Sequence, residues 1–414
     1  MSQVQTLSNT HGKSVTPFSV ATVIMTLLYV MPQTLLFVRN DMLAIIATLY
    51  YFVFLSKYVS IDQVFKVLLL GLPYSILYWI VGYSGNFKLG FVIPFMTLIT
   101  LVMPCFAIIA VVKRNNWKEQ KFISITTAIS LLFVAITTFV ALADNPLIMR
   151  EMTGGGEYYI TQARLRGVGS YGIAYSMGAL FIAFWSLRRY IKKSFIPPIV
   201  YLVMTIVSGL LVVQSQFGTL LFITIGGVAL HYFIEARTFP KRIMVLAVAI
   251  IVIISSQALI KMGMTMFGGE VLRYKFQLIY DGIWGGSEVE NISGERSQFQ
   301  LAALSFFLQS PVWGCSGVVF NEVFYSAHST MIAVLAATGL IGFISYISAF
   351  YSAIKKVLSE CFISVAEKRL YYPVVLFYLS FAFLNPIDFS FECSWVIFFV
   401  IPLLYIMVFS QARK

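Results

Sequence analysis

The chain has 414 residues, of which 59% are hydrophobic and only 11% are charged, and its mean hydropathy is +0.86. Soluble domains carry about 25% charged residues, so this composition excludes an ordinary soluble protein and indicates a protein embedded in a membrane. The net charge of +12 does not indicate a nucleic-acid partner, because lysines and arginines cluster in alternate connections between apolar segments.

Twelve apolar runs approach the length of about 20 residues that a membrane-spanning helix needs. We predict spans at 17–38, 42–56, 62–84, 89–112, 122–143, 170–187, 196–213, 217–234, 243–262, 329–353, 370–387 and 393–411. The predicted fold class is therefore all-α, with a polar cytoplasmic tail at 1–16 and a single transmembrane domain at 17–414. The polar tail and the length of the first run do not match a cleavable signal peptide.

The distribution of charge predicts the orientation of these spans. With both termini in the cytoplasm, twenty of the 29 basic residues lie on the cytoplasmic side, together with five acidic residues. The other side holds nine basic and twelve acidic residues. This is the positive-inside pattern, and an odd number of spans would break it. We therefore expect a multi-pass protein of a cytoplasmic membrane.

Two of the predicted outer connections are long. Residues 144–169 join the fifth and sixth spans, and residues 263–328 join the ninth and tenth. A long connection is usually either functional or disordered, and the second contains too many aromatic and aliphatic residues for disorder. We therefore expect the function to lie in these two loops, on the non-cytoplasmic face.

Four arginines are predicted to face outward: Arg164 and Arg166 in the first loop, and Arg273 and Arg296 in the second. The planar N–H donors of arginine match phosphate oxygens. For each arginine alone, pairing with a loop glutamate is an equally good explanation. The glutamates that fit this role are Glu151, Glu157, Glu270 and Glu295. As a group, the arginines favour a diphosphate or other polyanionic ligand.

His328, which closes the second loop, is the one histidine predicted to face outward. A neutral imidazole accepts the proton of an attacking hydroxyl group near pH 7, so His328 is a candidate general base. On position alone, a histidine that hydrogen-bonds a backbone carbonyl at the membrane interface is the better explanation.

The carboxylates give only a weak indication of a metal site. Glu288 and Glu290 have the spacing of a chelating pair, and Asp388 and Glu392 would share one helical face, but neither pair has a partner histidine or a second acidic cluster. Asp41 is a further candidate base. We expect catalysis without a metal or other cofactor, and the four cysteines show no metal-like spacing.

Residues 297–310 of the second loop are expected to form a helix that Pro311 ends. Its apolar side carries Phe299, Leu301, Leu304, Phe307 and Leu308. This pattern fits a helix that lies in the membrane interface over a lipid-linked substrate, and it fits an ordinary packed loop helix equally well.

Short motifs follow one another in order along the second half of the chain. They are Glu295-Arg296 at the start of the loop helix, Pro311-Val312-Trp313-Gly314-Cys315-Ser316-Gly317, Ala327-His328-Ser329, and Gly339-Leu340-Ile341-Gly342. This series resembles the O-antigen polymerase and O-antigen ligase superfamily, and residues 163–169 resemble the arginine loop of that family. The chain departs from the family pattern at Gln216, where an arginine is common, and at Ser329, where asparagine is common.

The resemblance implies a glycosyltransferase of the bacterial inner membrane whose active face is periplasmic or extracellular. Such enzymes transfer a growing glycan from undecaprenyl diphosphate to an acceptor hydroxyl group. The resemblance favours the polymerase of a surface polysaccharide (O-antigen, capsule or exopolysaccharide), which uses the non-reducing end of another lipid-linked repeat unit as acceptor. Arg296 and His328 would then be catalytic, and Arg164, Arg166 and Arg273 would bind the diphosphate. A chain-length regulator is a candidate partner.

Two alternatives stay open. An O-antigen ligase would transfer the glycan to a sugar of lipid A-core by the same chemistry. A flippase for lipid-linked oligosaccharides, or another transporter, is the third choice, because transport paths carry ionisable residues within the spans and here the charges gather in the outer loops.

Overall fold

The computed structural model consists of helices, and the residues that it describes include no strand. Those residues are 15–38, 40–84, 92–145, 147–154, 157–191, 197–215, 217–236, 238–254, 258, 261–263, 265, 273, 277, 280, 290–314, 329–385 and 391–412. The helices are α1 (Pro17–Val30), η1 (Thr34–Leu36), α2 (Asn40–Tyr50), η2 (Tyr51–Leu55), α3 (Ile61–Ser84), α4 (Val92–Arg114), α5 (Trp117–Asp144), α6 (Ile148–Gly154), α7 (Glu157–Leu165), α8 (Tyr171–Leu187), α9 (Pro198–Gln214), α10 (Gly218–Glu235), α11 (Phe239–Ile254), α14 (Glu290–Gln309), α15 (Thr330–Glu360), α16 (Val365–Leu384), α17 (Phe391–Trp395), η4 (Val396–Val400) and α18 (Ile401–Ala412).

Within the described residues, five helices are long and apolar enough to cross a membrane. They are Ile61–Tyr78, Thr97–Arg114, Trp117–Asp144, Thr330–Glu360 and Phe391–Phe409. Six further apolar helices are shorter, at 10–17 residues. The all-helical prediction is confirmed, and each of the twelve predicted spans overlaps a helix. The number of membrane crossings and their orientation stay predictions.

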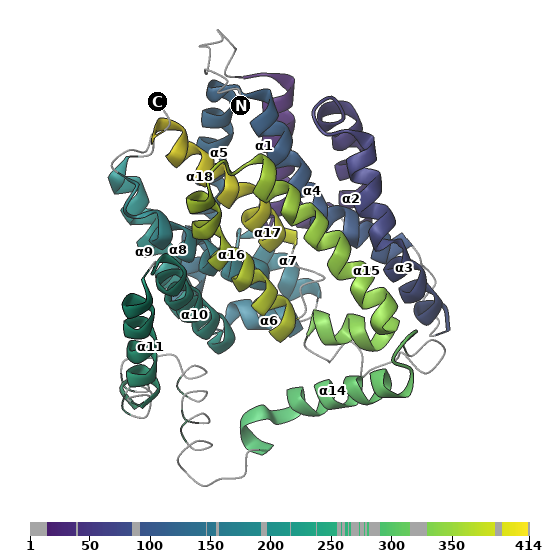
Figure 1. The fold of residues 1–414 in the computed structure, drawn as a ribbon, viewed down its shortest axis with the longest axis vertical. Helices are drawn as coiled ribbons and strands as arrows, with labels where there is room; N and C mark the ends of the chain where they lie inside the picture. Colours follow the sequence, from purple (N-terminus) through teal and green to yellow (C-terminus); the bar gives the residue numbers. More distant parts are fainter. Residues whose placement is uncertain are drawn as a thin grey trace.

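Contacts at one end of the bundle show that the long helices alternate in direction. Thr16, just before α1, donates a hydrogen bond from Oγ1 to Glu119 Oε1 near the start of α5 (2.6 Å). Arg114, at the end of α4, bonds both oxygens of Glu119 and also donates to the hydroxyl of Tyr58, just before α3 (2.6 Å). We call this end, defined by these four residues, the basic end. Figure 1 places the start of α1 and the end of α18 there as well.

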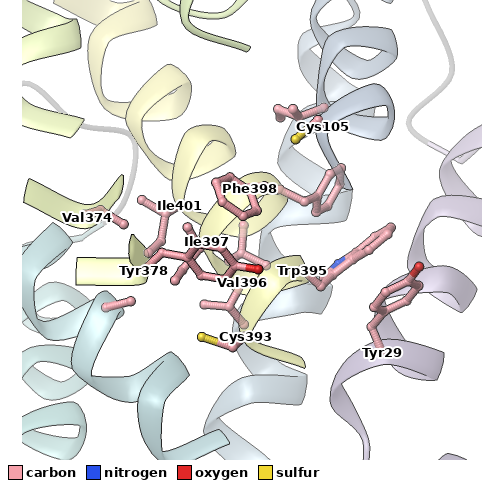
Figure 2. Packing of buried hydrophobic residues seen from close by; sticks show 14 of the residues in the cluster. Tyr29, Cys105, Val374, Tyr378, Cys393, Trp395, Val396, Ile397, Phe398 and Ile401 are labelled. Atoms are coloured by element: carbon pink, nitrogen blue, oxygen red, sulfur yellow. The ribbon is translucent and has the colours of Figure 1, made fainter. Parts of the chain in front are cut away.

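The segment 391–409, formed by α17, η4 and most of α18, lies in the middle of the bundle (Figure 2). Trp395 packs against Tyr29 of α1, with ring centroids 4.5 Å apart, and its Nε1 donates to Thr26 Oγ1 at 3.1 Å. On another side, the ring of Phe398 meets Tyr378 of α16, with centroids 4.8 Å apart. A helix that is apolar on every side is expected in such a buried position.

α3 and α15 pack against each other, and Ser345 of α15 joins them next to a proline. Pro73 cannot donate a backbone hydrogen bond, so it weakens the ladder of α3. The amide of the next residue, Tyr74, donates to Ser345 Oγ at 3.1 Å, and Ser345 Oγ donates in turn to the carbonyl of Leu70. Ser345 therefore bridges the two backbone groups of one turn of α3 and fixes the position of α15.

α15 is broken at Gly339, whose φ of +61° and ψ of −165° are not helical. The turn 311–314, which follows α14, fills this break. The amides of Leu340 and Ile341 donate to the carbonyls of Pro311 (2.8 Å) and Val312 (3.3 Å). Two of the motifs that the sequence analysis singled out, one beginning at Pro311 and one at Gly339, therefore meet in the structure.

α14 crosses the end of α15 that lies opposite the basic end (Figure 1). The predicted helix at 297–310 is present, although it begins earlier, at Glu290. Of its predicted apolar side, Leu304 and Phe307 pack against a small cluster that α14 forms with α15, whereas Leu301 and Leu308 are exposed. One apolar flank of α14 is therefore packed and another faces outward.

Candidate functional site

The arginine loop at 163–169 is shaped by the way α7 ends. Gly167 has a φ of +78°, which favours glycine. Its amide donates to the carbonyl of Arg164 at 2.9 Å, and the amide of Val168 donates to the carbonyl of Ala163 at 3.1 Å. This pair of bonds is a Schellman motif. It ends α7 and turns the chain toward Ser170, where α8 begins.

Two threonines of α5 fix this loop to the bundle. Thr137 Oγ1 donates to the carbonyl of Gly167 at 2.6 Å, and the amide of Gly169 donates to Thr138 Oγ1 at 2.7 Å. Since backbone groups in a buried loop must find hydrogen-bond partners, these two side chains hold the loop in one position. The loop lies at the end of α5 opposite the basic end.

The loop presents Ser170 and Arg164 to a buried carboxylate. Ser170 caps α8 by accepting from the amide of Gly172 (3.2 Å), and its hydroxyl donates to Glu392 Oε1 at 2.7 Å. Glu392, at the start of α17, is only 4% exposed. A carboxylate buried to this degree needs charged or hydrogen-bonding partners. The guanidinium of Arg164, which is half-buried, lies close enough to interact electrostatically with it.

The segment before α17 connects this carboxylate to the start of α15. The carbonyl of Asn385, at the end of α16, accepts from the amide of Thr330 at 3.3 Å. The Asn385 side chain donates to the hydroxyl of Tyr175 in α8 at 3.2 Å. Ser329, which is buried, caps α15 by accepting from the amide of Ile332 at 3.2 Å. Four helix ends therefore meet here, those of α8, α15, α16 and α17.

We call Arg164, Ser170, Tyr175, Asn385 and Glu392 the candidate site. It combines a half-buried guanidinium, a buried carboxyl group and two hydroxyl groups. A guanidinium has five N–H donors in one plane, and this geometry matches the oxygens of a phosphate group. The positive charge and the hydroxyl groups are suited to binding the phosphate of a ligand.

Arg166 lies on the other side of the loop. It is exposed, and its charge acts on Tyr159 of α7 rather than on Glu392. The Tyr159 hydroxyl donates to Glu151 Oε2 at 2.5 Å, and Asn145 Nδ2 donates to the same oxygen at 2.8 Å. The bond from Tyr159, helped by that from Asn145, holds the pKa of the Glu151 carboxyl below its usual range. Glu151, a candidate partner for an arginine, is thus bound by neutral groups.

The described residues include only part of the remaining predicted site. Arg296 lies in α14, on a part of the helix where side chains are outside the described residues, and His328 is outside them altogether. Arg273 is described as a single exposed residue. The structure therefore places Arg164 in the candidate site and Arg166 beside it, whereas it leaves Arg273, Arg296 and His328 as predictions.

No group of three histidine, cysteine, aspartate or glutamate side chains is close enough to hold a metal ion, as far as the described residues are concerned. Glu288 and Asp388 lie outside the described residues, and the side chains of Asp41 and Glu290 are not described. The structure therefore neither supports nor tests the weak metal candidates of the sequence.

Sequence reasoning missed Ser170, Tyr175 and Asn385, and it considered Glu392 only as a metal ligand. Ser170 had a local signal, since a serine before an apolar run is a typical helix cap. Glu392 had one too, because a lone acidic residue at the start of an apolar span requires a partner. Nothing local indicates that Ser170 and Glu392, 222 residues apart, are bonded to each other.

Comparison of the sequence with protein-family models and with curated proteins gives no match to either. The interpretation of the site therefore rests on its geometry and on the motifs in the chain.

Proposed function

We propose that this protein is a membrane glycosyltransferase that polymerises a bacterial surface polysaccharide from an undecaprenyl-diphosphate-linked donor. One observation carries the proposal: two distant segments are bound to the same short stretch of chain. Ser170, from the arginine loop, bonds Glu392, and Thr330, two residues after His328, bonds Asn385. These are the segments whose sequences resemble the O-antigen polymerases and ligases, and an active site formed from them requires such a meeting.

The proposed reaction moves the glycan in one displacement. The acceptor hydroxyl oxygen forms a bond to the anomeric carbon of the donor sugar, and the bond between that carbon and the diphosphate oxygen breaks. The diphosphate leaves with the electron pair, and Arg164 stabilises its developing charge, together with Arg166, Arg273 and Arg296. His328 takes the proton of the acceptor hydroxyl. Glu392 touches no substrate in this scheme and is a positioning residue for Arg164.

The proposal includes an orientation in the membrane. We propose twelve crossings, with the basic end in the cytoplasm and the candidate site on the periplasmic or extracellular face. This agrees with the positive-inside pattern, since Arg114 and the start of α1 lie at one end and the loop that carries Arg164 lies at the other. A lipid-linked donor would reach the site from the membrane, and the exposed flank of α14, at Leu301 and Leu308, would lie along the interface.

The buried acidic residues favour an enzyme over a transporter. Among the described residues, the buried carboxylates are Glu119, Glu367 and Glu392. Each lies within the first three residues of its helix, in α5, α16 and α17 respectively. A path across the membrane is expected to carry ionisable groups in the middle of the spans. Among the described residues, the buried carboxyl groups lie at helix ends and leave the middle of the spans without such a path.

The surface glycan of a deletion strain tests the proposal and separates its alternatives. Core carrying a single repeat unit, restored to long chains by the wild-type gene, is the result expected for a polymerase. Bare core with lipid-linked polymer accumulating would identify a ligase. Loss of external lipid-linked units with their accumulation inside would identify a flippase. An unchanged glycan in the deletion strain would refute all three functions.

A further inference from the structure

An apolar groove lies between α9 and α10. Both helices pack on α8 at glycines: a Cβ on Gly209 would come within 3.0 Å of the Phe181 ring, and one on Gly227 within 2.4 Å of Ile182. The groove between them has a volume of about 260 Å³. Its lining residues are Phe181, Trp185, Gly209, Val212, Val213, Leu221, Thr224, Ile225 and Val228.

The groove offers almost no hydrogen-bonding groups to an occupant. Its one hydroxyl, on Thr224, donates to the carbonyl of Leu220 in its own helix. The floor is formed by Phe181 and Trp185, which stack with ring centroids 5.9 Å apart. Ile225, on the rim, is 55% exposed, so the groove opens to the outside of the bundle. A hydrocarbon chain is the ligand that such a lining favours.

A fixed cation lies next to Trp185, one of the residues that line the groove. The guanidinium carbon of Arg188 lies 5.0 Å from the ring centroid of Trp185 and 5.1 Å from that of Tyr232. Its NH1 donates to the carbonyl of Trp185 (2.5 Å) and contacts His231 Nε2 (3.3 Å), and its NH2 donates to the Tyr232 hydroxyl (3.1 Å). These contacts use three of five N–H donors, so two stay available for an anion within the described surroundings.

Arg188 differs in this respect from Arg189 beside it. Arg189 is paired with Glu235 at 2.6 Å, and its side chain is 60% exposed. Arg188, by contrast, is held between two aromatic rings without a carboxylate partner among the described contacts. Because its side chain is already ordered, an anion that binds it loses little further conformational entropy. Only Arg188 of this pair therefore has the properties of a binding group.

The length of the site matches one leaflet of a bilayer. On α10, the groove residues run from Leu221 to Val228, and Tyr232, which bonds Arg188, lies one turn farther. Leu221 and Tyr232 are separated by about 16 Å along the helix at 1.5 Å per residue. This is about half of the ~30 Å hydrocarbon core. An acyl chain that fills one leaflet has about this length, so the stretch of α10 beside Arg188 is long enough for one such chain.

We infer that this groove binds an anionic glycerophospholipid, with one acyl chain between α9 and α10 and its headgroup phosphate on Arg188. The inference is independent of the proposed function. Its basis is charge complementarity beside an apolar groove, along a stretch of α10 of about the length of one leaflet. Basic pockets between membrane helices bind anionic headgroups in the same way. A polyprenyl chain is longer than one leaflet, so it fits this site less well than a phospholipid does.

Quenching of Trp185 fluorescence by brominated lipids tests the inference, because Trp185 forms part of the groove floor. The full-length protein is reconstituted in phosphatidylcholine bilayers with increasing fractions of dibrominated phosphatidylglycerol or dibrominated phosphatidylcholine. The signal of Trp185 is the difference between wild type and Trp185→Phe. We expect half-quenching at about a fivefold lower mole fraction of the anionic lipid, the effect of roughly one cation–phosphate contact near a membrane surface.

Two matched pairs of variants assign the effect to the groove. Arg188→Gln should abolish the preference for the anionic lipid, whereas Arg189→Gln, which removes the same charge one residue away, should keep it. Val213→Phe fills the groove and should reduce quenching by both lipids. Val203→Phe, at an exposed position of α9 outside the groove, should not. The groove pair keeps the test valid if an arginine variant fails to fold.

Several results would overturn the inference. Equal quenching by the two lipids would show that the groove has no preference for an anionic headgroup. If Arg188→Gln and Arg189→Gln lose the preference for the anionic lipid equally, the preference comes from general surface charge and not from a site at Arg188. Stronger displacement of the brominated lipid by a polyprenyl phosphate than by unlabelled phosphatidylglycerol would assign the groove to the donor lipid instead.

Discussion

Gly314 and Gly339 lie so close together that neither position has room for a side chain. A Cβ on Gly339 would come within 2.5 Å of the Gly314 nitrogen, and a Cβ on Gly314 within 2.2 Å of the Ala337 carbonyl oxygen. Both residues also have positive φ angles, of +77° and +61°. The turn after α14 can therefore enter the break in α15 only because both positions are glycine.

Substitution of either glycine should destabilise the protein. Gly339→Ala and Gly314→Ala each force an L-residue into a backbone conformation that costs about 1–3 kcal/mol, and each adds a clash with backbone. The matched control is Gly226→Ala in α10, where a Cβ meets nothing within 4 Å, and which should be neutral or slightly stabilising. Thermal unfolding of purified protein in detergent measures the difference. Equal unfolding midpoints for Gly339→Ala and Gly226→Ala would contradict the prediction.

Substitution of Arg164 should slow polymer formation. Arg164→Gln removes the charge beside Glu392, and we expect a loss of roughly 10²–10³ in rate, as for other groups that stabilise a leaving anion. Arg164→Lys keeps the charge without the planar fork and should be intermediate. If Glu392 positions Arg164, Glu392→Gln should weaken binding of the lipid diphosphate by folded protein. If Glu392 is purely structural, the same substitution should lower the amount of folded protein instead. Arg189→Gln, at the basic end, serves as the control. Normal polymer from Arg164→Gln would contradict the proposed site.

His328 should affect the rate of transfer and not the binding of the donor. His328→Ala removes the proposed general base, and we expect a loss of about 10²–10⁴ in rate with little change in the affinity for the lipid-linked donor. A histidine that only anchors the start of α15 would tolerate asparagine, so near-normal polymer from His328→Asn would end the catalytic role. Single-turnover transfer by purified protein, with donor binding measured separately, distinguishes the catalytic role of His328 from an anchoring role.

The contact between Tyr159 and Glu151 should make part of the stability depend on pH. Because the hydrogen bond lowers the pKa of Glu151 in the folded protein, its contribution is complete above the ordinary glutamate pKa of about 4.3 and is lost as the pH falls through the lower folded value. Tyr159→Phe should therefore unfold at a lower temperature than wild type at pH 7, and the difference should shrink in acid. Tyr158→Phe, at the exposed neighbouring position, is the control. A difference that does not vary with pH would contradict the assignment.

Reporter fusions test the orientation of the helices. Fusions after Lys121, near the start of α5, and after Lys193 should give a cytoplasmic signal, because both positions are expected at the basic end. Fusions near Gly155 and Gly285 should give an external signal. A cytoplasmic signal at Gly285 would contradict twelve crossings and would place the second long loop on the same side as Arg114.

Apolar length was enough to predict where helices occur, because each span must satisfy its own backbone hydrogen bonds in a membrane. The same reasoning treated 144–169 as a loop, whereas the structure has α6 and α7 there. Short polar helices such as α6 and α7 have no long apolar run, so apolar length does not predict them. The break at Gly339 was visible as a glycine motif, yet its conformation depends on the turn at 311–314, and no local property of α15 reveals that contact.

The candidate site was predicted only in part, for a related reason. Arginine chemistry identified Arg164 and Arg166 together, but the sequence did not distinguish the residue beside Glu392 from the one beside Tyr159. That distinction depends on the left-handed conformation of Gly167 and on the two threonines of α5 that hold the loop. Partners far apart in the sequence become neighbours only through packing of whole helices, which local patterns do not encode.

The central position of the segment 391–409 means that helices made early in synthesis wait for their core partners. Tyr29 leaves the ribosome early, and Trp395, which packs against it, follows roughly 370 residues later, a delay of about 20–70 s at 5–20 residues per second. Throughout that interval Tyr29 and Thr26 lack the side chain that they contact in the folded protein. A nascent chain that stops after α16 would hold every residue of the arginine loop and would still lack Glu392. It would also lack the indole that packs against Tyr29, so the same segment completes both the core of the bundle and the candidate site.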